Sequence, residues 1–256
     1  MRAWGVTDIG LRRRENQDTY AFTEFGFEDS PDTVVAVVCD GMGGVNGGQL
    51  ASSTAVESFI REVHSRAFAN MSEDQVREME TLCVQEANRA VYERSLEDPT
   101  LHGMGTTLVS AIVSPDSAVV CNVGDSRAYI IDDDGIRRVT RDHSVVESLV
   151  ESGDITREEA RTHPNRNLVT RALGPDKSVE CDSFTVKIKS GNSILLCSDG
   201  LIVTVEDYEL QNIISSEADG AEALNKLLVL ALSRGAPDNV TAVLIRSEEE
   251  VTRQDG

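Results

Sequence analysis

Hydrophobic and polar positions along this chain follow both the strand period and the helix period. The first 40 residues read as strands, with the run RRRENQD as a polar interruption. Residues 48–68 and 72–96 have apolar positions at helical spacing, and Ser72 with Gln75 has the spacing of a capping box. These two segments are predicted to form a pair of amphipathic helices.

From Thr106 the pattern changes to short β-rich runs. The polar turns SPD, GDS and DDDG divide them, and this spacing predicts an antiparallel meander. A polar segment at about 142–167 follows; it contains a short helix capped by Thr156 and Glu159 and has little apolar surface to bury. We expect this segment to be a mobile flap over a site.

The last third of the chain again contains both kinds of pattern. The strand-like runs VECDSFTVKI and SILLC precede helices near 206–216 and 219–234, and the strand VTAVLIR follows. Strands at both ends with helix pairs between them favour a layered α/β (α+β) fold over strict βαβ winding. We expect one domain over 1–246 and a polar, frayed tail over 247–256.

Length and composition are typical of a globular protein. The 256 residues, 40% of them hydrophobic and 27% charged, can bury one sizeable core, with two small domains as the alternative. No stretch reaches the length of about 18 apolar residues that indicates a membrane span. The N-terminus lacks the apolar core of a signal peptide. We therefore expect a cytoplasmic protein.

The five cysteines form an odd set without C-x-x-C spacing: Cys39, Cys83, Cys121, Cys181 and Cys197. Cys39, Cys121 and Cys197 lie inside apolar runs that read as strands. We predict reduced core residues, and a thiolate nucleophile is the alternative.

The formal net charge of the chain is −20. Phosphodiester backbones and anionic membranes are bound chiefly through clustered Lys and Arg, so this charge argues against nucleic acid and membranes as partners. Most of the 44 acidic residues need no explanation beyond a solvated surface. Only acids in apolar or glycine-rich contexts invite a functional interpretation.

One such acid is Asp40, which ends the apolar run TVVAVVC and precedes several glycines. A plain structural turn is one reading of this stretch. A dinucleotide fingerprint fails on spacing, because Asn46 takes the place of its third glycine. A phosphate cradle is disfavoured, because the carboxylate repels an anion unless a cation lies between them. The remaining reading is a site for a hard divalent ion, which prefers carboxylate and carbonyl oxygens.

Further carboxylates occupy the edges of predicted strands. Asp199 ends the run SILLCS as Asp40 ends its own strand, and Asp238 lies in a turn before the last strand. Asp18 in RRRENQD and Asp125 in VGDS occupy similar positions. If these acids converge, they bury repelling charges unless cations neutralise them. Convergence therefore implies a metal centre.

Seven short blocks carry a resemblance to a known family: TDIGLRRRENQD, VVCDGMGG, GMGTTL, VGDSRAY, NLVTRALG, ILLCSDG and PDNVTAVL. In this order, over about residues 4–246, the chain resembles the bacterial metal-dependent Ser/Thr protein phosphatases of the PPM family, the protein phosphatase 2C type. The resemblance implies a central sandwich of two antiparallel β-sheets flanked by pairs of α-helices. It also implies two Mn²⁺ or Mg²⁺ ions at one edge of the sandwich.

The resemblance assigns metal ligands by motif position. Asp40 resembles the carboxylate that bridges both metals, and Gly41 resembles a carbonyl ligand. Asp199 and Asp238 resemble ligands of the second metal. Asp125, together with Asp199, matches the site of a more weakly bound third metal.

Two further positions complete the implied site. Asp18 resembles the acid that holds the centre through metal-bound water, and Arg13 resembles the arginine that grips the substrate phosphate. Two cations about 3.5–4 Å apart activate a bridging water and help balance charge in the transition state. A guanidinium orients phosphorus for in-line attack, so no protein nucleophile is needed.

The sequence departs from the family pattern at two positions. Met42 stands where some relatives have a histidine as candidate general acid, so water or another residue must protonate the leaving group. His163, in the flap, is a candidate for this role. Gln17 replaces a glutamate often found beside Asp18, and this loss of charge is expected to weaken metal binding modestly.

The resemblance implies a serine/threonine phosphoprotein phosphatase whose substrates are targets of a Ser/Thr protein kinase. Nothing in the sequence indicates oligomerisation, so we expect a monomer. One alternative is a catalytically silent metal-binding module that recognises phosphoproteins, a pseudophosphatase. Another is a haloacid-type phosphatase with Asp40 as covalent nucleophile. The D-x-D pattern of that family is absent, because the second residue after Asp40 is Met42.

Overall fold

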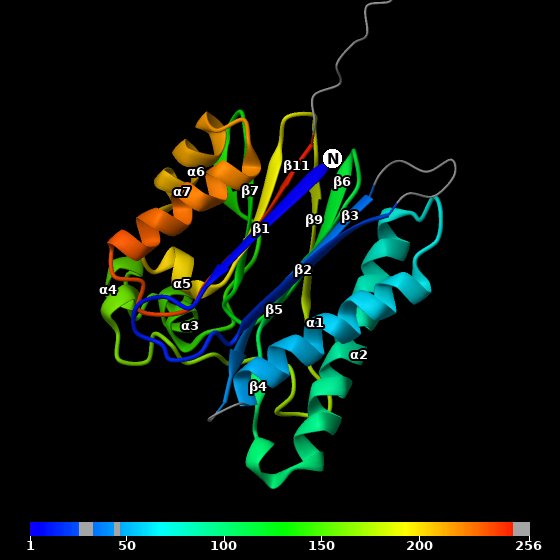
Figure 1. The fold of residues 1–256 in the computed structure, drawn as a ribbon, viewed down its shortest axis with the longest axis vertical. Coiled ribbons are helices and arrows are strands. Elements are labelled where there is room, and N and C mark those ends of the chain that lie inside the picture. The colour runs from blue at the N-terminus through cyan, green and yellow to red at the C-terminus, as the bar shows by residue number, and fades with distance from the viewer. Residues whose placement is uncertain (26–32, 44–46, 248–256) are drawn as a thin grey trace, which may run out of the picture.

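The computed structural model describes residues 1–25, 33–43 and 47–247. Two antiparallel β-sheets lie face to face at the centre of the protein (Figure 1). Sheet A has the strand order β1-β11-β10-β7-β8: β1 (Arg2–Asp8), β7 (Arg127–Asp132), β8 (Gly135–Arg138), β10 (Ser193–Cys197) and β11 (Val240–Arg246). Sheet B has the order β2-β3-β5-β6-β9, with β4 paired to β3: β2 (Asp18–Phe25), β3 (Thr33–Met42), β4 (Gly105–Thr106), β5 (Leu108–Val113), β6 (Ser117–Val123) and β9 (Asp182–Lys187).

Helices cover the outer faces of both sheets (Figure 1). α1 (Gly47–Arg66) and α2 (Glu73–Glu97) pack on sheet B. α5 (Asp199–Ile202), α6 (Asp207–Ser216) and α7 (Gly220–Ser233) pack on sheet A. The result is a layered helix–sheet–sheet–helix order. The apolar patterns predicted layered α/β packing, and the family resemblance implied the two-sheet sandwich.

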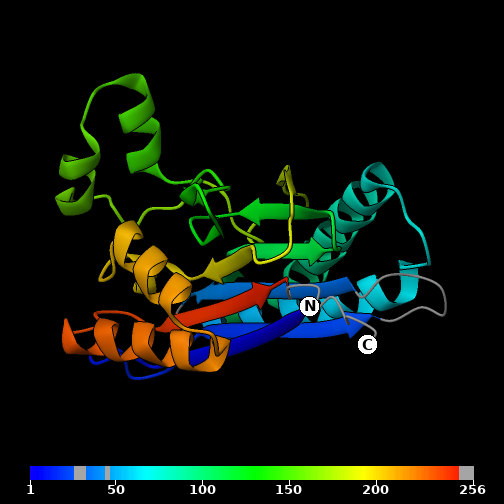
Figure 2. The same ribbon diagram turned by 90° about the horizontal axis from the view of Figure 1, so that it is seen from above.

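Two short helices project from one end of these layers (Figure 2). They are α3 (Val145–Ser152) and α4 (Arg157–Thr162), and both belong to the predicted flap. A 3-10 helix, η1 (Pro99–Leu101), follows α2.

β3 shows why the central strands are apolar along their whole length. Successive side chains of a strand point to opposite faces. Val35 and Val37 belong to the core beneath α1 and α2, whereas Val34, Ala36 and Val38 belong to the core between the two sheets. Because both faces of the strand are covered, neither set can be polar, and the strand that carries Asp40 is rigidly held.

Most of the predicted elements are confirmed. The predicted helices correspond to α1 and α2, with ends that differ by one or two residues, and the capping box of Ser72 and Gln75 is present. Thr156 and Glu159 also form a capping box, at the start of α4. The layered fold with two antiparallel sheets is confirmed.

The predicted meander from Thr106 is wrong in one respect. β5 and β6 belong to sheet B but β7 and β8 belong to sheet A, so the chain changes sheets at residues 124–126. Apolar alternation cannot distinguish a hairpin from such a crossing, because both bury one face of each strand. The crossing places Asp125 at the edge where the two sheets meet.

Two of the helices were not predicted from the sequence. The sequence pattern did not indicate α3 and α5, because each is shorter than the window in which helical periodicity is read.

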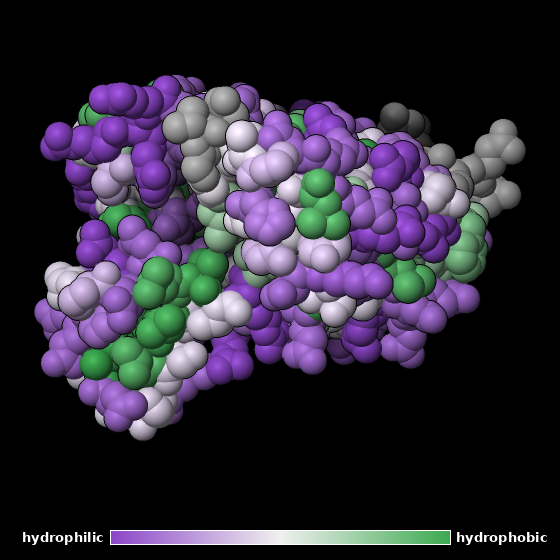
Figure 3. All heavy atoms as spheres, turned by 90° about the horizontal axis from the view of Figure 1, so that it is seen from below, coloured by the Kyte–Doolittle hydropathy of each residue, from purple (hydrophilic) through white to green (hydrophobic). Residues whose placement is uncertain are grey.

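The predicted tail lies outside the described residues beyond Ser247. No helix in the three described ranges has the length and apolarity needed to cross a membrane. Polar residues cover most of the face shown in Figure 3.

The contact between Gly220 and Trp4 gives a test of how α7 packs on β1. A Cβ atom at Gly220 would lie 2.2 Å from Trp4 Cε3. We expect Gly220→Ala to lower the free energy of unfolding by about 1–3 kcal/mol, because the indole must move. Denaturant unfolding measures this, with the exposed Glu222→Ala as a control that should change it by less than about 0.5 kcal/mol. Equal effects of the two variants would contradict the packing argument.

Candidate metal centre

Four strands bring predicted acids to one edge of the sandwich. The register of β2 and β3 pairs Asp18 with Asp40. Asp199 follows β10, and Asp238 lies just before β11. Because β10 and β11 are antiparallel neighbours, the end of one and the start of the other meet at the same edge. Asp125 reaches this edge from the turn between β6 and β7.

The five carboxylates affect one another strongly. Burial raises the pKa of Asp40 and that of Asp199 well above the usual range, and the charges of Asp18, Asp125 and Asp238 raise both further. Burial also raises the pKa of Asp18 and that of Asp125, each to about 6. Fully ionised, these groups would repel one another in a partly desolvated site, so the site favours the binding of protons or cations.

Ser198 joins the two sheets beside these acids. Its Oγ donates to Asp18 Oδ2 at 2.7 Å and accepts from the Thr241 N–H at 3.0 Å. The Ser198 N–H donates to the Thr241 carbonyl, also at 3.0 Å. Asp18 belongs to sheet B and Thr241 to sheet A, so this buried hydroxyl fixes the position of one sheet's acid relative to the other sheet.

The glycine after each strand-end aspartate permits a close approach of backbones. A Cβ atom at Gly41 would lie 2.1 Å from the Gly48 carbonyl oxygen. A Cβ atom at Gly200 would lie 2.0 Å from the carbonyl oxygen of Asn239. Both glycines are therefore needed for packing, because a side chain at Gly41 would push β3 away from α1 and one at Gly200 would push α5 away from the segment that carries Asp238.

Asn239 holds the loop that carries Arg13. Its Nδ2 donates to the carbonyl oxygens of Ile9 at 2.9 Å and Glu15 at 3.0 Å, and its Oδ1 accepts from the Gln17 N–H at 2.9 Å. Asn239 is only 4% exposed. With three hydrogen bonds in a buried position, it fixes the loop from both ends.

Arg13 extends from this loop toward the acids. Its Nη2 donates to Asp238 Oδ2 at 2.6 Å, and its side chain is 50% exposed. This hydrogen bond is the main cause that raises the pKa of Arg13, and the charges of Asp238, Asp40 and Asp199 add to it. The guanidinium therefore lies within electrostatic reach of the centre, with half its surface open to an approaching anion.

The sequence interpretation did not single out Ser198 or Asn239. Each is a polar residue directly beside a site aspartate, in CSDG and in PDNV. That adjacency was the only local sign of a role for Ser198 and Asn239 in the site. Their hydrogen-bond partners lie far away in the chain, so the sequence did not reveal them. Gln17, by contrast, was singled out, and its side chain lies against Gly48 at the start of α1 and donates to Glu15 Oε2 at 3.4 Å.

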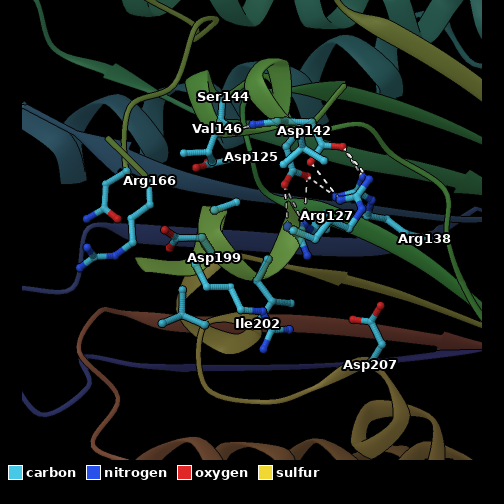
Figure 4. Close-up of a pocket in the computed structure, with 17 residues that line it drawn as sticks. Asp125, Arg127, Arg138, Asp142, Ser144, Val146, Arg166, Asp199, Ile202 and Asp207 are labelled. Atoms are coloured by element: carbon cyan, nitrogen blue, oxygen red, sulfur yellow. Dashed lines mark hydrogen bonds and ion pairs between the residues drawn. The ribbon is translucent and has the colours of Figure 1, made fainter. Parts of the chain in front are cut away.

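A cavity of ≈350 Å³ extends from Asp125 and Asp199 toward α3 and α4 (Figure 4). Figure 4 shows these two carboxylates near each other and, on the other side, the ion pair of Arg127 with Asp142, whose Nη2 and Oδ2 are 2.6 Å apart. Five arginines line the cavity: Arg127, Arg138, Arg157, Arg161 and Arg166. The segment predicted as a flap thus forms one wall of a cavity beside the acids; its mobility stays a prediction.

His163 is placed differently from the other predicted site residues. It ends α4, is half-buried, and accepts the Asn165 N–H at Nδ1 at 3.1 Å. It is not among the described residues that line the cavity. The role of His163 as general acid stays a prediction.

The acids offer unsatisfied oxygens to a cation. Asp18 Oδ1 and Asp199 Oδ1 are buried and have no hydrogen-bond partner among the described residues. Within the same part of the chain, no three His, Cys or acidic side chains form a ready-made metal cage. Mg²⁺ needs no such cage, because it usually keeps several waters and uses one or two carboxylates. The donors therefore fit hard divalent cations that retain water.

Comparisons with known proteins agree with this site. The family described as "Protein phosphatase 2C" matches residues 12–241. The chain is 35% identical to serine/threonine phosphatase stp of Listeria monocytogenes serotype 4b over 99% of this chain and 98% of that protein. Stp1 from Staphylococcus aureus superposes with a TM-score of 0.85 at 37% identity, over 96% of this chain and 95% of that one. The catalytic domain of the serine threonine protein phosphatase PstP, in complex with two manganese ions, gives 0.78 at 29% identity, over 95% of this chain and 96% of that one.

The chain therefore belongs to the protein phosphatase 2C family. By class it is a protein serine/threonine phosphatase, and the predicted family and fold are both confirmed.

The bonds of Asn239 predict a role in positioning Arg13. We expect Asn239→Ala to lower kcat/KM by about 10- to 100-fold, mainly through KM, because the loop that carries the guanidinium loses its anchor. Steady-state hydrolysis of p-nitrophenyl phosphate measures this, and circular dichroism verifies the fold. Asn225→Ala, at an exposed position of α7, is the matched control. If both variants keep wild-type KM, Asn239 does not position Arg13.

The raised pKa of Asp18 predicts how stability depends on pH when metals are removed. Its folded pKa of about 6 exceeds the unfolded value of about 3.9, so the folded state binds more protons between these values. The free energy of unfolding in chelator should then fall as pH rises through this window. Asp18→Asn removes one contributor, so we expect its stability to fall less steeply with pH. At about pH 7.5 its free energy of unfolding should be about 3 kcal/mol above that of the wild type.

Thermal unfolding in chelator across this pH range measures the effect. Added Mn²⁺ should raise the melting temperature of the wild type more than that of the variant, because binding to the folded state is stabilising. Parallel pH profiles for the two proteins in chelator would show that Asp18 does not titrate as argued.

Proposed function

We propose that this phosphatase hydrolyses phosphoserine and phosphothreonine in proteins at a centre of two divalent cations, Mn²⁺ or Mg²⁺. The observation that carries the proposal is the convergence of five mutually repelling carboxylates on the sandwich edge that Arg13 faces. Bound there, the cations would supply an activated water at neutral pH and stabilise charge on the phosphoryl oxygens.

The ligand assignment follows the motif positions of the family resemblance. Asp40 would be a ligand of both cations, and its buried carboxyl interacts with those of Asp18, Asp199, Asp125 and Asp238. Gly41 would contribute its carbonyl oxygen, and Asp199 and Asp238 would hold the second cation. Asp125 lies beside Asp199 and is proposed, with it, to hold a weaker third cation. The unpartnered Asp199 Oδ1 supports this assignment.

Asp18 and Arg13 are proposed to orient water and substrate rather than to bind a cation directly. Asp18, fixed by Ser198, is proposed to accept hydrogen bonds from water around the cations. Arg13 is proposed to bind two phosphate oxygens, which holds phosphorus in line with the attacking oxygen. Its present bond to Asp238 occupies only one nitrogen, and its exposure leaves the others accessible.

The leaving serine or threonine oxygen needs a proton, and Met42 cannot supply one. His163 is the proposed donor, from Nε2, because Nδ1 already accepts the Asn165 N–H. It lies outside the cavity lining, so α4 must move toward the acids before His163 can act. Without that movement, water is the donor.

The proposed substrates are phosphoproteins that a Ser/Thr protein kinase modifies. Residues next to the phosphorylated side chain would lie in the cavity between the acids and α4. A silent phosphoprotein-binding module remains the second candidate function, but Asp18, Asp40, Asp199, Asp238 and Arg13 are all present, and none of these positions favours it.

Metal-dependent hydrolysis tests the proposal. We expect wild type to hydrolyse p-nitrophenyl phosphate and a phosphothreonine peptide with Mn²⁺, and to stop in chelator. Asp199→Asn should lower this rate by more than about 100-fold, because a metal ligand loses its charge. Asp133→Asn, in the exposed turn between β7 and β8, is the control and should keep it.

Two results would count against the proposal. If wild type binds Mn²⁺, measured by calorimetry, but hydrolyses neither compound, the silent module is the better function. If hydrolysis continues unchanged in Asp199→Asn, the ligand assignment is wrong although the activity stands.

A further inference from the structure

Two cysteines pack against the same core beside sheet B, and neither is one of the metal-centre acids. The register of β6 and β9 pairs Cys121 with Ser183, and Cys181 lies two residues earlier, directly before β9. Cys121 is fully buried in the core beneath α2, and Cys181 packs against that core but is partly exposed. Cys181 directly precedes β9, the edge strand of sheet B, and is partly accessible to solvent.

The surroundings of the pair are chemically unusual. Interaction with the Cys121 thiol is the main cause that lowers the pKa of Cys181 to about 7, and Thr81 also contributes. The fully buried Glu80 interacts with Cys121, and burial raises the pKa of Glu80 to about 8. Glu80 Oε1 accepts from Ser110 Oγ at 2.7 Å, while Oε2 has no partner among the described residues.

We propose that Cys181 and Cys121 form a redox-sensitive dithiol, which hydroperoxides oxidise to an intramolecular disulfide. Cys181 is the attacking thiol because it is the accessible member of the pair, and Cys121 is the resolving thiol because it lies beside Cys181. The proposal concerns a modification site and does not depend on the phosphatase mechanism.

The reaction balances without another co-reactant. The Cys181 thiol first ionises, and its thiolate attacks one oxygen of hydrogen peroxide; an S–O bond forms and the O–O bond breaks. The displaced hydroxide becomes water with the proton that the thiol released on ionisation. Cys121 then attacks the Cys181 sulfur; the S–S bond forms and the S–O bond breaks. The hydroxide that leaves becomes water with the Cys121 proton, which Glu80 can relay. Two thiols lose two electrons in total, and one peroxide becomes two waters.

The remaining cysteines provide an internal contrast. Cys39, Cys83 and Cys197 are completely buried. Burial raises the pKa of Cys83 and that of Cys197 to about 12 and raises that of Cys39 as well. Thiols that stay protonated and inaccessible do not react with peroxide, so oxidation should select Cys181.

The pair is connected to the metal centre through Asp182. Asp182 Oδ1 accepts from Arg171 Nη1 at 2.8 Å, and its Oδ2 lies 3.2 Å from His143 Nε2. His143 Nδ1 accepts the Gly124 N–H at 3.1 Å, immediately before Asp125 in the chain. Diagonal neighbours on paired strands have Cα atoms about 7–8 Å apart, beyond the usual disulfide span of about 4.4–6.8 Å. Bond formation must therefore move Cys181 and, with it, Asp182.

Peptide mapping of the full chain after exposure to hydrogen peroxide tests the proposal. We expect a Cys121–Cys181 cross-linked peptide that dithiothreitol removes. Cys83→Ala should keep this cross-link, and Cys181→Ser should abolish it. In Cys121→Ala, Cys181 should accumulate as the sulfenic acid, which dimedone traps. Before oxidation, iodoacetamide at about pH 7 should label Cys181 more than about 100-fold faster than the buried Cys83. The larger thiolate fraction of Cys181 outweighs the lower nucleophilicity that goes with its lower pKa.

Melting curves of the reduced variants verify that each folds. The proposal is overturned if wild type gives no Cys121–Cys181 peptide while Cys181 becomes sulfinic acid, or if the cross-link joins other cysteines. Mn²⁺-dependent hydrolysis by the oxidised protein should fall severalfold and recover with dithiothreitol in wild type but stay constant in Cys181→Ser. Unchanged hydrolysis with the disulfide formed would overturn the connection through Asp182 and leave the modification site intact.

Discussion

The burial of five carboxylates at the edge where two sheets meet is the constraint on which the rest of this structure depends. Each acid lies at or near the end of a strand of the packed sandwich. Because β3, β10 and β11 are buried along nearly their whole length, these strands cannot move apart to relieve the repulsion. The fold therefore holds the acids in place at a cost in free energy, which protons or cations must offset. A site with this property binds divalent ions more tightly than the same acids on a surface would.

Neutral polar groups hold the acids and Arg13 in position. The hydroxyl of Ser198 bonds to an acid of one sheet and to the backbone of the other, and the amide of Asn239 bonds to the loop that carries Arg13. Because none of these groups is charged, they position the acids and the guanidinium without neutralising them. The two D-G pairs serve the same end by allowing backbones to touch. The carboxylates and the Arg13 guanidinium therefore keep their charges for binding ligands, while hydrogen bonds and packing fix their positions.

The sequence predicted those parts of the site that depend on local pattern. Asp40 and Asp199 stand out because each interrupts a continuous apolar run, and the helix caps at Ser72 and Thr156 follow from residues three apart. What could not be predicted depends on distant partners: Asn239 and Ile9 lie 230 positions apart in the chain. The passage of the chain from sheet B to sheet A before β7 could not be predicted either, because a hairpin and a connection between two sheets show the same apolar alternation.

The charges around the cavity, rather than the net charge of −20, would link metal binding to substrate binding. Charges beyond about 8 Å are largely screened at physiological ionic strength, so the surface acids matter less to a phosphate than the residues near the cavity. There, most arginines form ion pairs with acids, including Arg127 with Asp142 and Arg161 with Glu206. Without cations the five carboxylates outweigh Arg13, and the centre repels phosphate. Metal ions bound at the proposed centre would reverse that sign, and metal and phosphoprotein would then each strengthen the binding of the other by the same factor.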